Sequence, residues 1–384
     1  MLAYMLTTLI MPVAIFNKLL FVLLMIWTIG ILMRPSGPKL VLPAFVVLAI
    51  FLYGYLLSIL FYSNSDVYND HSLALQFLMA GCIPLLIHFV EFYSIDMDYL
   101  VELCGKMMVS FTAIYWFLCL NQDVPYSAEF VTWFNDVSNS RGALPRDYLG
   151  ESMVQTLALS TVAFLYVPWC MVCKRLIKCP KTSDFIWVAL LGLTMVVSGR
   201  RGTILVALVF LLSLALVLGG FFLRLFITLV ILLTFLIFIP WVSDNTLIFS
   251  SSDVSNSVKV GHLISFINQI DPTNIVFGKG LGSIYYSLGV GERLPHTELT
   301  PIDYVRYIGL PLTVFLYLIL LFPKLYRQPF SCERKYLFMS FFLYLILSMS
   351  NPTLVNSYGM LVVLWYWVKY REPLKRTSLQ LSMV

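Results

Sequence analysis

The residues best suited to chemistry gather between positions 277 and 309, in the segment FGKGLGSIYYSLGVGERLPHTELTPIDYVRYIG. Glycines stand at every second position near its start, and charged side chains follow them in a chain that is otherwise strongly apolar. The basic side chains are Lys279, Arg293, His296 and Arg306, and the acidic ones are Glu292, Glu298 and Asp303. We therefore expect the functional site of the protein in this segment.

The composition is that of a membrane protein. The chain of 384 residues is 60% hydrophobic and only 12% charged, whereas a soluble domain carries about 25% charged residues. The net charge of +5 does not indicate a nucleic-acid partner, because basic loop residues set membrane orientation and contact anionic lipid. The first residues have no basic n-region and no small-residue cleavage site, so we expect Met1 to begin the mature chain.

Apolar runs near the ~20 residues that cross a bilayer recur along the chain. They lie at 2–16, 19–33, 40–61, 72–92, 101–120, 152–173, 185–197, 202–219, 223–241, 301–322, 336–350 and 357–369. The runs predict an all-α, polytopic integral membrane protein with about 12 transmembrane helices. The first two are short enough to form one broken span.

Basic residues in the connections set the orientation. Four clusters fall on one side if the runs alternate, and we predict that this side, with both chain ends, is cytoplasmic. The clusters are Arg34 with Lys39; Lys174, Arg175, Lys178 and Lys181; Lys324, Arg327, Arg334 and Lys335; and Lys369, Arg371, Lys375 and Arg376. The predicted organisation is nine helices in 1–241 with an outer loop at 121–151, a large outer loop at 242–300 between helices 9 and 10, three helices in 301–370, and a tail at 371–384.

The chain has seven cysteines, and neither long outer loop contains one, so we predict no disulfide framework. Cys170, Cys173 and Cys179 resemble half a zinc site, but no second pair of ligands accompanies them. We predict no metal and no cofactor.

Two adjacent arginines, Arg200 and Arg201 in VVSGRRGTILVALV, interrupt an apolar stretch on the predicted outer side. One helix over 185–218 would be about 51 Å long, so the chain must turn near 198–202. The limb before the turn would be only about 20 Å long, which places the turn below the outer membrane surface. A guanidinium in the bilayer centre costs about 2.5–3.5 kcal/mol on insertion scales. The pair indicates either an anion site or anchors that reach to the interface.

The large outer loop has two further features. Apolar residues at helical spacing in 257–270 predict an amphipathic helix that lies on the membrane or caps a cavity. The alternating glycines Gly278, Gly280 and Gly282 fit a plain loop turn and a close approach to phosphate equally well. They are not a dinucleotide-binding motif, because the strand and helix that such a motif requires are missing from the pattern.

The sequence TPID predicts a helix start, with Thr300 as N-cap, Pro301 at the first position and Asp303 at the third. Asp303 therefore has a structural role, and Arg306 lies one turn on, where it could pair with Asp303. Capping does not explain His296 and Glu298. We interpret His296 as a candidate base above the arginines, although a lone loop histidine is usually a solvated side chain.

Two stretches resemble a known family. SGRRGTILVALV is similar to the arginine-bearing turn of the O-antigen polymerase and ligase superfamily of bacterial envelope glycan assembly. FGKGLGS, followed by HTELTPIDYVRYIGLPLTVFLYL, resembles the glycine-rich segment and the loop-to-helix junction of the same family. The layout of about twelve spans with one large outer loop is similar as well, and the motifs cover under a fifth of the chain.

The resemblance implies a function. The family transfers an undecaprenyl-diphosphate-linked glycan to an acceptor hydroxyl at the periplasmic face of the inner membrane, without metal. Polymerases extend another lipid-linked unit, and ligases transfer to the lipid A core. Ligases often have His-Asn where this chain has His296-Thr297, and the spacing from Glu298 to Arg306 is more similar to that of polymerases. We expect a polymerase, with a ligase as the alternative. Expected partners are the lipid-linked donor and acceptor, membrane lipid and, as a further candidate, a chain-length regulator.

The resemblance and the charges together assign roles. The diphosphate-binding candidates are Arg200 or Arg201 as the family arginine, Arg306, Lys279, and Lys259, which stands where many members have arginine. His296, or Glu298 as second choice, would accept the proton of the attacking hydroxyl, and the anomeric centre would invert. Arg141, Arg146 and Arg293 are candidates for contact with the glycan or acceptor, although ordinary loop charges explain the first two equally well.

A lipid-glycan flippase would also bury arginines for a diphosphate. It should carry charges in many spans and show an internal repeat. The sequence has no visible repeat, and its unusual charges concentrate at the predicted outer face. This distribution favours a transferase.

Overall fold

The computed structural model is mostly helical. It describes residues 1–381 except 36–37, 63–68, 122, 139–142, 148–152, 158, 199–200, 219, 221–224, 226–227, 230–253, 324–331 and 350–352. The chain divides into two units. Unit 1 comprises Met1–Thr8, Ile15–Val101 and Gly261–Val384, and unit 2 comprises Leu9–Ala14 and Glu102–Val260.

Unit 1 holds the polar segment that the sequence singles out. Its helices are α1 (Leu2–Ile10), α2 (Ile15–Leu32), α3 (Leu42–Tyr62), α4 (His71–Cys82), the 3₁₀ turn η1 (Ile83–Leu86), α5 (Ile87–Phe92), most of α13 (Val254–Gln269), α14 (Pro272–Phe277), α15 (Thr300–Ile308), α16 (Leu310–Leu321), α17 (Cys332–Met349) and α18 (Ser357–Leu381). A short antiparallel hairpin, β3 (Tyr285–Ser287) with β4 (Glu292–Leu294), follows α14, and Tyr286 pairs with Arg293.

Four helical stretches in the described part of the chain are long and apolar enough to cross a membrane. They are Ile15–Leu32, Leu42–Leu60, His71–Phe92 and Met97–Leu120. Shorter apolar helices lie at Thr182–Val197, Gly202–Leu214 and Leu310–Leu321. The structure thus confirms a mostly helical protein with helices of membrane-spanning type, and the number of twelve spans stays a prediction.

Helix α18 forms the core of unit 1, because its side chains from Met360 to Trp367 are almost completely buried on every face. A helix that is apolar all round belongs in the interior. Its polar atoms satisfy the last carbonyls of α16, which have no partner inside their own helix. The Tyr366 hydroxyl donates to Leu321 O at 2.7 Å, and Trp367 Nε1 donates to Leu320 O at 3.1 Å.

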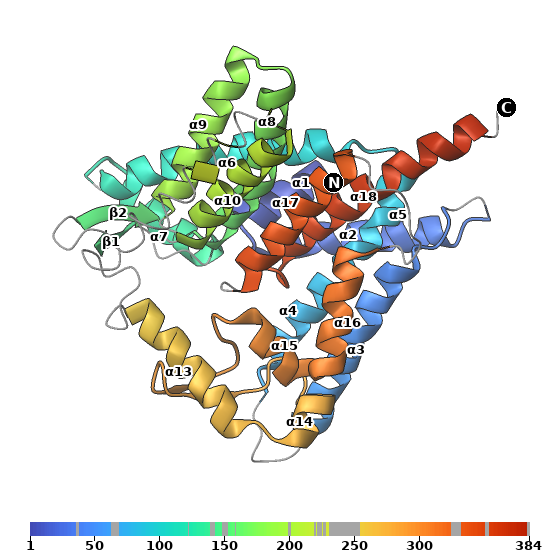
Figure 1. Cartoon of the computed structure of the whole chain (residues 1–384). Helices are drawn as coiled ribbons and strands as arrows, with labels where there is room; N and C mark the ends of the chain where they lie inside the picture. Colours follow the sequence, from blue (N-terminus) through green and yellow to red (C-terminus); the bar gives the residue numbers. More distant parts are fainter. Residues whose placement is uncertain are drawn as a thin grey trace. The chain divides into compact units, whose positions relative to one another are not determined.

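Helix α3, about 31 Å long, separates two polar regions of unit 1 (Figure 1). In the C-terminal half of α3, the Tyr53 hydroxyl donates to Phe277 O at 3.0 Å, and Ser58 adjoins Gly280. Just before its N-terminal end, Arg34 lies over the ring of Phe92, 5.4 Å from its centroid. The 277–309 segment and the cationic end of α18 therefore lie at opposite ends of α3. Their predicted positions on opposite faces of a membrane require this separation.

Unit 2 contains a helical bundle and a second hairpin. Its elements are most of α6 (Met97–Leu120), α7 (Ser127–Ser138), β1 (Ala143–Asp147), β2 (Met153–Leu157), the 3₁₀ turn η2 (Ser160–Leu165), α8 (Tyr166–Lys178), α9 (Thr182–Val197) and α10 (Arg201–Leu218). Arg175 Nη2 links α6 to α9, because it binds Glu102 Oε1 at 2.9 Å and Asp184 Oδ1 at 3.2 Å.

Three predicted spans need correction. Residues 153–157 of the run at 152–173 form strand β2, paired antiparallel with β1, so helical structure begins only at Ser160. The run at 2–16 stops at Ile10, because Pro12 follows closely and cannot continue a helix. The run at 301–322 breaks at Gly309, where φ is 82°. A count of apolar residues detects none of these interruptions.

Other boundaries agree more closely. The predicted interruption of the helix near 198–202 agrees with the observed bounds, since α9 ends at Val197 and α10 begins at Arg201. The outer loop predicted at 121–151 contains α7 and β1, and α18 continues through most of the predicted tail to Leu381. The run at 223–241 lies almost entirely outside the described residues.

Candidate functional site

The alternating glycines serve the close approach of one backbone to another. Gly278, Gly280 and Gly282 all have positive φ, at 80°, 90° and 70°. A Cβ on Gly280 would lie 2.4 Å from Ser58 N in α3, and one on Gly278 would lie 2.4 Å from Tyr307 O in α15. Only glycine fits both the conformation and the space.

The backbone amides of this segment already donate hydrogen bonds to backbone carbonyls of the protein. Lys279 N donates to Arg306 O at 2.7 Å, Gly280 N donates to Tyr307 O at 3.0 Å, and Leu281 N donates to Gly54 O at 2.9 Å. A phosphate-binding loop needs such amides free to point at the ligand. Of the two interpretations of the glycines, the structure therefore favours the structural one. These glycines hold the segment between α3 and α15.

Helix α15 is the first half of a broken helix. Gly309 interrupts it with a φ of 82°, and only glycine fits at this position, because a Cβ would lie 2.1 Å from Val276 O. The carbonyls of Arg306 and Tyr307, which the break leaves exposed at the end of α15, accept the amides just described. Broken helices inside membrane proteins are tolerated where protein partners satisfy the freed backbone groups.

The loop before α15 is fastened by Asp303. Its Oδ2 accepts from Thr297 N at 2.7 Å, and its Oδ1 lies 3.1 Å from Arg306 Nη2. The predicted structural role of Asp303 and its pairing with Arg306 are confirmed. Thr300 is not the N-cap as predicted, because it is already the first helical residue and Leu299 precedes it as the cap.

Arg306 is buried, with 8% of its surface exposed. Besides Asp303, its Nη2 donates to Pro295 O at 2.6 Å. The Tyr285 ring lies on one side, with its centroid 4.2 Å from the guanidinium carbon, and the Tyr307 ring is at 5.0 Å. Nε and Nη1 are buried and have no hydrogen-bond partner among the residues that the structure describes. Unsatisfied buried donors are costly, and a ligand would satisfy these.

A buried histidine that the sequence analysis missed contacts Tyr285, the aromatic residue over Arg306. His262 in α13 is 2% exposed. Its Nδ1 lies 2.7 Å from the Tyr285 hydroxyl and 2.8 Å from Ser287 Oγ. Burial lowers the pKa of His262, and Arg306 acts in the same direction. Burial raises the pKa of Tyr285 to about 12.

Helix α13 has the predicted amphipathic form, and its apolar side faces outward. Leu263, Ile264 and Ile267 are exposed, whereas His262 and Ser265 are buried. Gly261 lies against Gly289 of the hairpin, and Ser265 Oγ accepts from Leu288 N at 2.7 Å. The stripe of small and polar residues between the apolar ones was the sequence signal that could have identified His262 as an inward-facing residue.

The two predicted proton acceptors lie near this group. His296 is exposed and Glu298 is half-buried, and both sit in the loop that Asp303 and Arg306 hold. Both act electrostatically on His262: Glu298 raises its pKa and His296 lowers it. The structure thus brings His296, Glu298 and Arg306 together in unit 1. We call Asp303, Arg306, Tyr285, His262 and Ser287 the Arg306 cluster.

The remaining predicted site residues are scattered. Lys279 is half-buried and adjoins Arg306 through its backbone, and Arg293 is exposed on β4. Lys259 is half-buried in the part of α13 that belongs to unit 2. Arg201 begins α10 and Arg146 lies in β1, but their side chains, and Arg200 and Arg141 as a whole, are outside the described residues.

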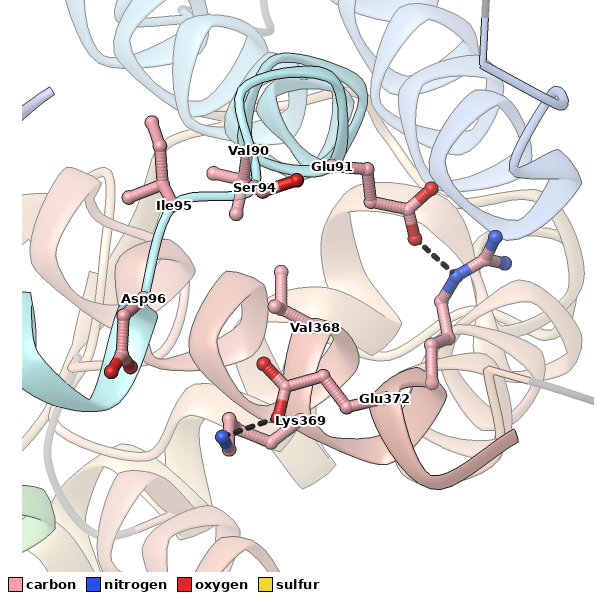
Figure 2. Close-up of a pocket in the computed structure, with 9 residues that line it drawn as sticks. Val90, Glu91, Ser94, Ile95, Asp96, Val368, Lys369 and Glu372 are labelled. Carbon is pink, nitrogen blue, oxygen red and sulfur yellow. Dashed lines mark hydrogen bonds and ion pairs between the residues drawn. The ribbon is translucent and has the colours of Figure 1, made fainter. Parts of the chain in front are cut away.

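A cavity of about 390 Å³ opens at the other end of α3 (Figure 2). We call it the tail pocket; it is lined by Val90, Glu91, Ser94, Ile95, Asp96, Val368, Lys369, Arg371 and Glu372. Arg371 Nε donates to Glu91 Oε1 at 2.7 Å, and Lys369 pairs with Glu372 and with Asp98 Oδ2, at 2.9 Å from the latter. Figure 2 shows Lys369 beside Glu372, and Arg371 is paired with Glu91, so both cations of this pocket have carboxylate partners.

No group of three or more His, Cys, Asp or Glu side chains that could hold a metal ion occurs among the described residues. Cys170 and Cys173 are buried in α8, and Cys179 is exposed at the end of that helix. The chemistry that the Arg306 cluster can support is anion binding by a guanidinium, beside a histidine and a carboxylate that can take a proton. Comparison of the chain with protein-family models, with curated proteins and with solved structures finds no match in any of the three.

Proposed function

We propose that the protein is a membrane glycosyltransferase. It polymerises undecaprenyl-diphosphate-linked oligosaccharide units at the periplasmic face of the inner membrane, into O-antigen or a related surface polysaccharide. The observation that carries the proposal is the buried Arg306, whose Nε and Nη1 have no partner in the described part of the chain. An arginine fork suits diphosphate oxygens. The apolar helices around it suit a lipid-linked substrate better than a soluble one.

The reaction assigned to this site is a displacement at the anomeric carbon of the donor. The acceptor hydroxyl oxygen forms a bond to that carbon, and the bond from the carbon to the diphosphate oxygen breaks. The diphosphate leaves with the electron pair, and Arg306 stabilises the charge that develops on it in a site shielded from water. His296, with Glu298 as the second candidate, accepts the hydroxyl proton. The configuration at the anomeric carbon inverts.

Access to Arg306 requires a local opening, because both unpartnered nitrogens are shielded from solvent. The loop at 295–299 is held at two points: Pro295 O accepts from Arg306 Nη2 and from the Tyr307 hydroxyl, and Thr297 N donates to Asp303 Oδ2. Release of Pro295 O would free the start of the loop and a further guanidinium donor. We propose that the loop moves when the diphosphate binds, and that this movement brings His296 to the acceptor. Arg200 and Arg201 remain candidates for a second contact with the substrate.

The test supplies the purified protein in detergent with a lipid-diphosphate-linked repeat unit and no other acceptor, and separates the products on a gel. We expect a ladder of multiples from the parent protein. The ladder should be lost in His296→Ala and in Arg306→Lys. Arg371→Lys, which makes the same change at an arginine paired with Glu91 in the tail pocket, is the matched control.

Two other products would change the conclusion. Transfer that occurs only when lipid A core is supplied would identify a ligase in place of a polymerase. Movement of the intact lipid between the leaflets of a vesicle, with no new glycosidic bond, would replace the transferase by a transporter.

A further inference from the structure

The guanidinium of Arg306 is held both at one edge and on its face. At the edge, Nη2 contacts Asp303 Oδ1 at 3.1 Å and Pro295 O at 2.6 Å. On the face, the ring centroid of Tyr285 is 4.2 Å from the guanidinium carbon. Asp303 and Pro295 O alone would let the guanidinium swing about Nη2. A ring against the face removes this freedom and fixes the direction of Nε and Nη1.

Tyr285 is itself held in place by hydrogen bonding at its hydroxyl group. Strand β3 alternates, so Tyr285 and Ser287 point into the protein and Tyr286 points out. The inward hydroxyls meet the same nitrogen, His262 Nδ1, at 2.7 and 2.8 Å. His262 is fixed in turn by the close contact of α13 with the hairpin, where Gly261 adjoins Gly289. A chain of contacts thus leads from α13 to Arg306.

We propose that Tyr285 and His262 are positioning residues for Arg306: the tyrosine ring sets the plane of the guanidinium, and the histidine locks the ring through its hydroxyl. This inference rests on the proposed role of Arg306 as the diphosphate-binding group. It adds two residues that touch neither the substrate nor the reacting atoms and that act only through the orientation of the guanidinium.

The charges around His262 fit this role. Burial and the nearby Arg306 and His296 lower its pKa, while Glu298 opposes them. The ring is therefore neutral at pH 7, and its Nδ1 accepts a hydrogen bond from a hydroxyl in one tautomer and donates one to a hydroxyl in the other. A protonated ring so close to Arg306 would place two cations together, which the cluster does not compensate.

The experiment measures the Kd of farnesyl diphosphate, a short polyprenyl diphosphate, for the full-length protein in detergent by calorimetry. Arg306→Ala establishes whether the probe reports on this arginine. Tyr285→Leu removes the ring and Tyr285→Phe keeps it. Tyr286→Leu, one position along the same strand and facing out, is the matched control.

We expect Tyr285→Leu to raise Kd roughly tenfold, since it removes a desolvated cation–π contact that holds the guanidinium in place. Tyr285→Phe should raise it only about twofold to threefold, and Tyr286→Leu should leave it unchanged. His262→Ala should resemble Tyr285→Phe. In the Tyr285→Phe background, His262→Ala should have no further effect, because the hydroxyl through which it acts has gone.

Different results overturn different parts of the account. An unchanged Kd in Arg306→Ala contradicts the proposed diphosphate site and this inference with it. A large effect of Arg306→Ala with equal effects of Tyr285→Leu and Tyr286→Leu overturns the inference alone. Additive effects of His262→Ala and Tyr285→Phe show that the histidine does not act through the tyrosine. If Tyr285→Leu does not fold, the conservative variants still decide the question.

Discussion

The Arg306 cluster and the tail pocket lie at opposite ends of α3, and their cations differ in how many carboxylate partners they have. In the tail pocket each cation meets carboxylates, and Lys369 has two, Asp98 and Glu372. In the Arg306 cluster one guanidinium shares a single carboxylate, Asp303, and keeps two nitrogens without a partner in the described part of the chain.

The difference indicates which end holds a ligand. A cation that has its own carboxylate needs no further ligand, and the more exposed of these pairs, Lys369 with Glu372, contributes only about 0–1 kcal/mol. A buried cation with unsatisfied donors is expensive to maintain, because its desolvation is not fully repaid inside the protein. The Arg306 cluster is therefore the arrangement that a bound anion would complete, whereas the tail pocket holds the end of α18 against the turn between α5 and α6.

The largest expected effect on stability is that of Asp303→Ala. It leaves Arg306 buried without its carboxylate, and we expect unfolding to become easier by about 3–5 kcal/mol. Glu372→Ala in the tail pocket should cost at most about 1 kcal/mol, because Lys369 keeps Asp98. Thermal unfolding in detergent measures both. Similar losses in the two variants would remove the contrast between the two ends.

Gly280→Ala should cause the next largest loss of stability. The new Cβ would lie 2.4 Å from Ser58 N at a φ of 90°, so we expect a loss of more than about 2 kcal/mol. Gly291→Ala is the matched control: its φ is 78°, but nothing lies within 4 Å of the new Cβ, and only the conformational cost of about 1 kcal/mol remains. If the melting temperature falls equally in Gly280→Ala and Gly291→Ala, the lack of space around Gly280 is not what excludes a side chain there.

The sequence predicted the local parts of this site and missed the distant ones. The pairing of Asp303 with Arg306 follows from their spacing on one helix, and the amphipathic character of α13 follows from its period. The partner of Gly280 is Ser58 in α3, and the partner of His262 is Tyr285. Such contacts between separate elements leave no local pattern, so sequence analysis could not choose between a turn and a phosphate loop.

The break at Gly309 is a different case, because a signal was present. Gly309 is followed two positions later by Pro311, and this combination is typical of an interrupted helix. The apolar run of 301–322 concealed it. The polar side chains of α15 are buried by protein, so an average over the run does not separate a membrane span from a half-helix packed inside the fold.

A smaller effect concerns pH. Because burial lowers the pKa of His262 in the folded protein, the unfolded chain binds the proton more readily below about pH 6.5. Stability should be complete above that pH and should fall as the pH drops toward the lowered pKa. We expect His262→Gln to reduce this loss when melting temperatures are followed from pH 7.5 to 5. A loss of the same size in the variant would assign the titration to another group.

The smallest expected effect has the opposite sign and lies in the tail pocket. Ser94 has a φ of 50°, and the bonds from Ser94 N to Glu91 O and from Ile95 N to Val90 O close the end of α5 around it. This is the position at a helix end where glycine is preferred. Ser94→Gly should therefore raise stability by up to about 1 kcal/mol. A lower melting temperature would indicate that the Ser94 side chain has a role in the pocket.

Arg306, and not the equally conspicuous Arg371, is the arginine that we propose binds the diphosphate. The most direct measurement is the rate of ladder formation from the lipid-linked repeat unit by Arg306→Lys and by Arg371→Lys. Lysine keeps the charge and loses the fork, so we expect the first variant to lose about 100-fold or more in rate and the second to stay within about twofold of the parent. Ladders of equal rate from the two variants would contradict the account.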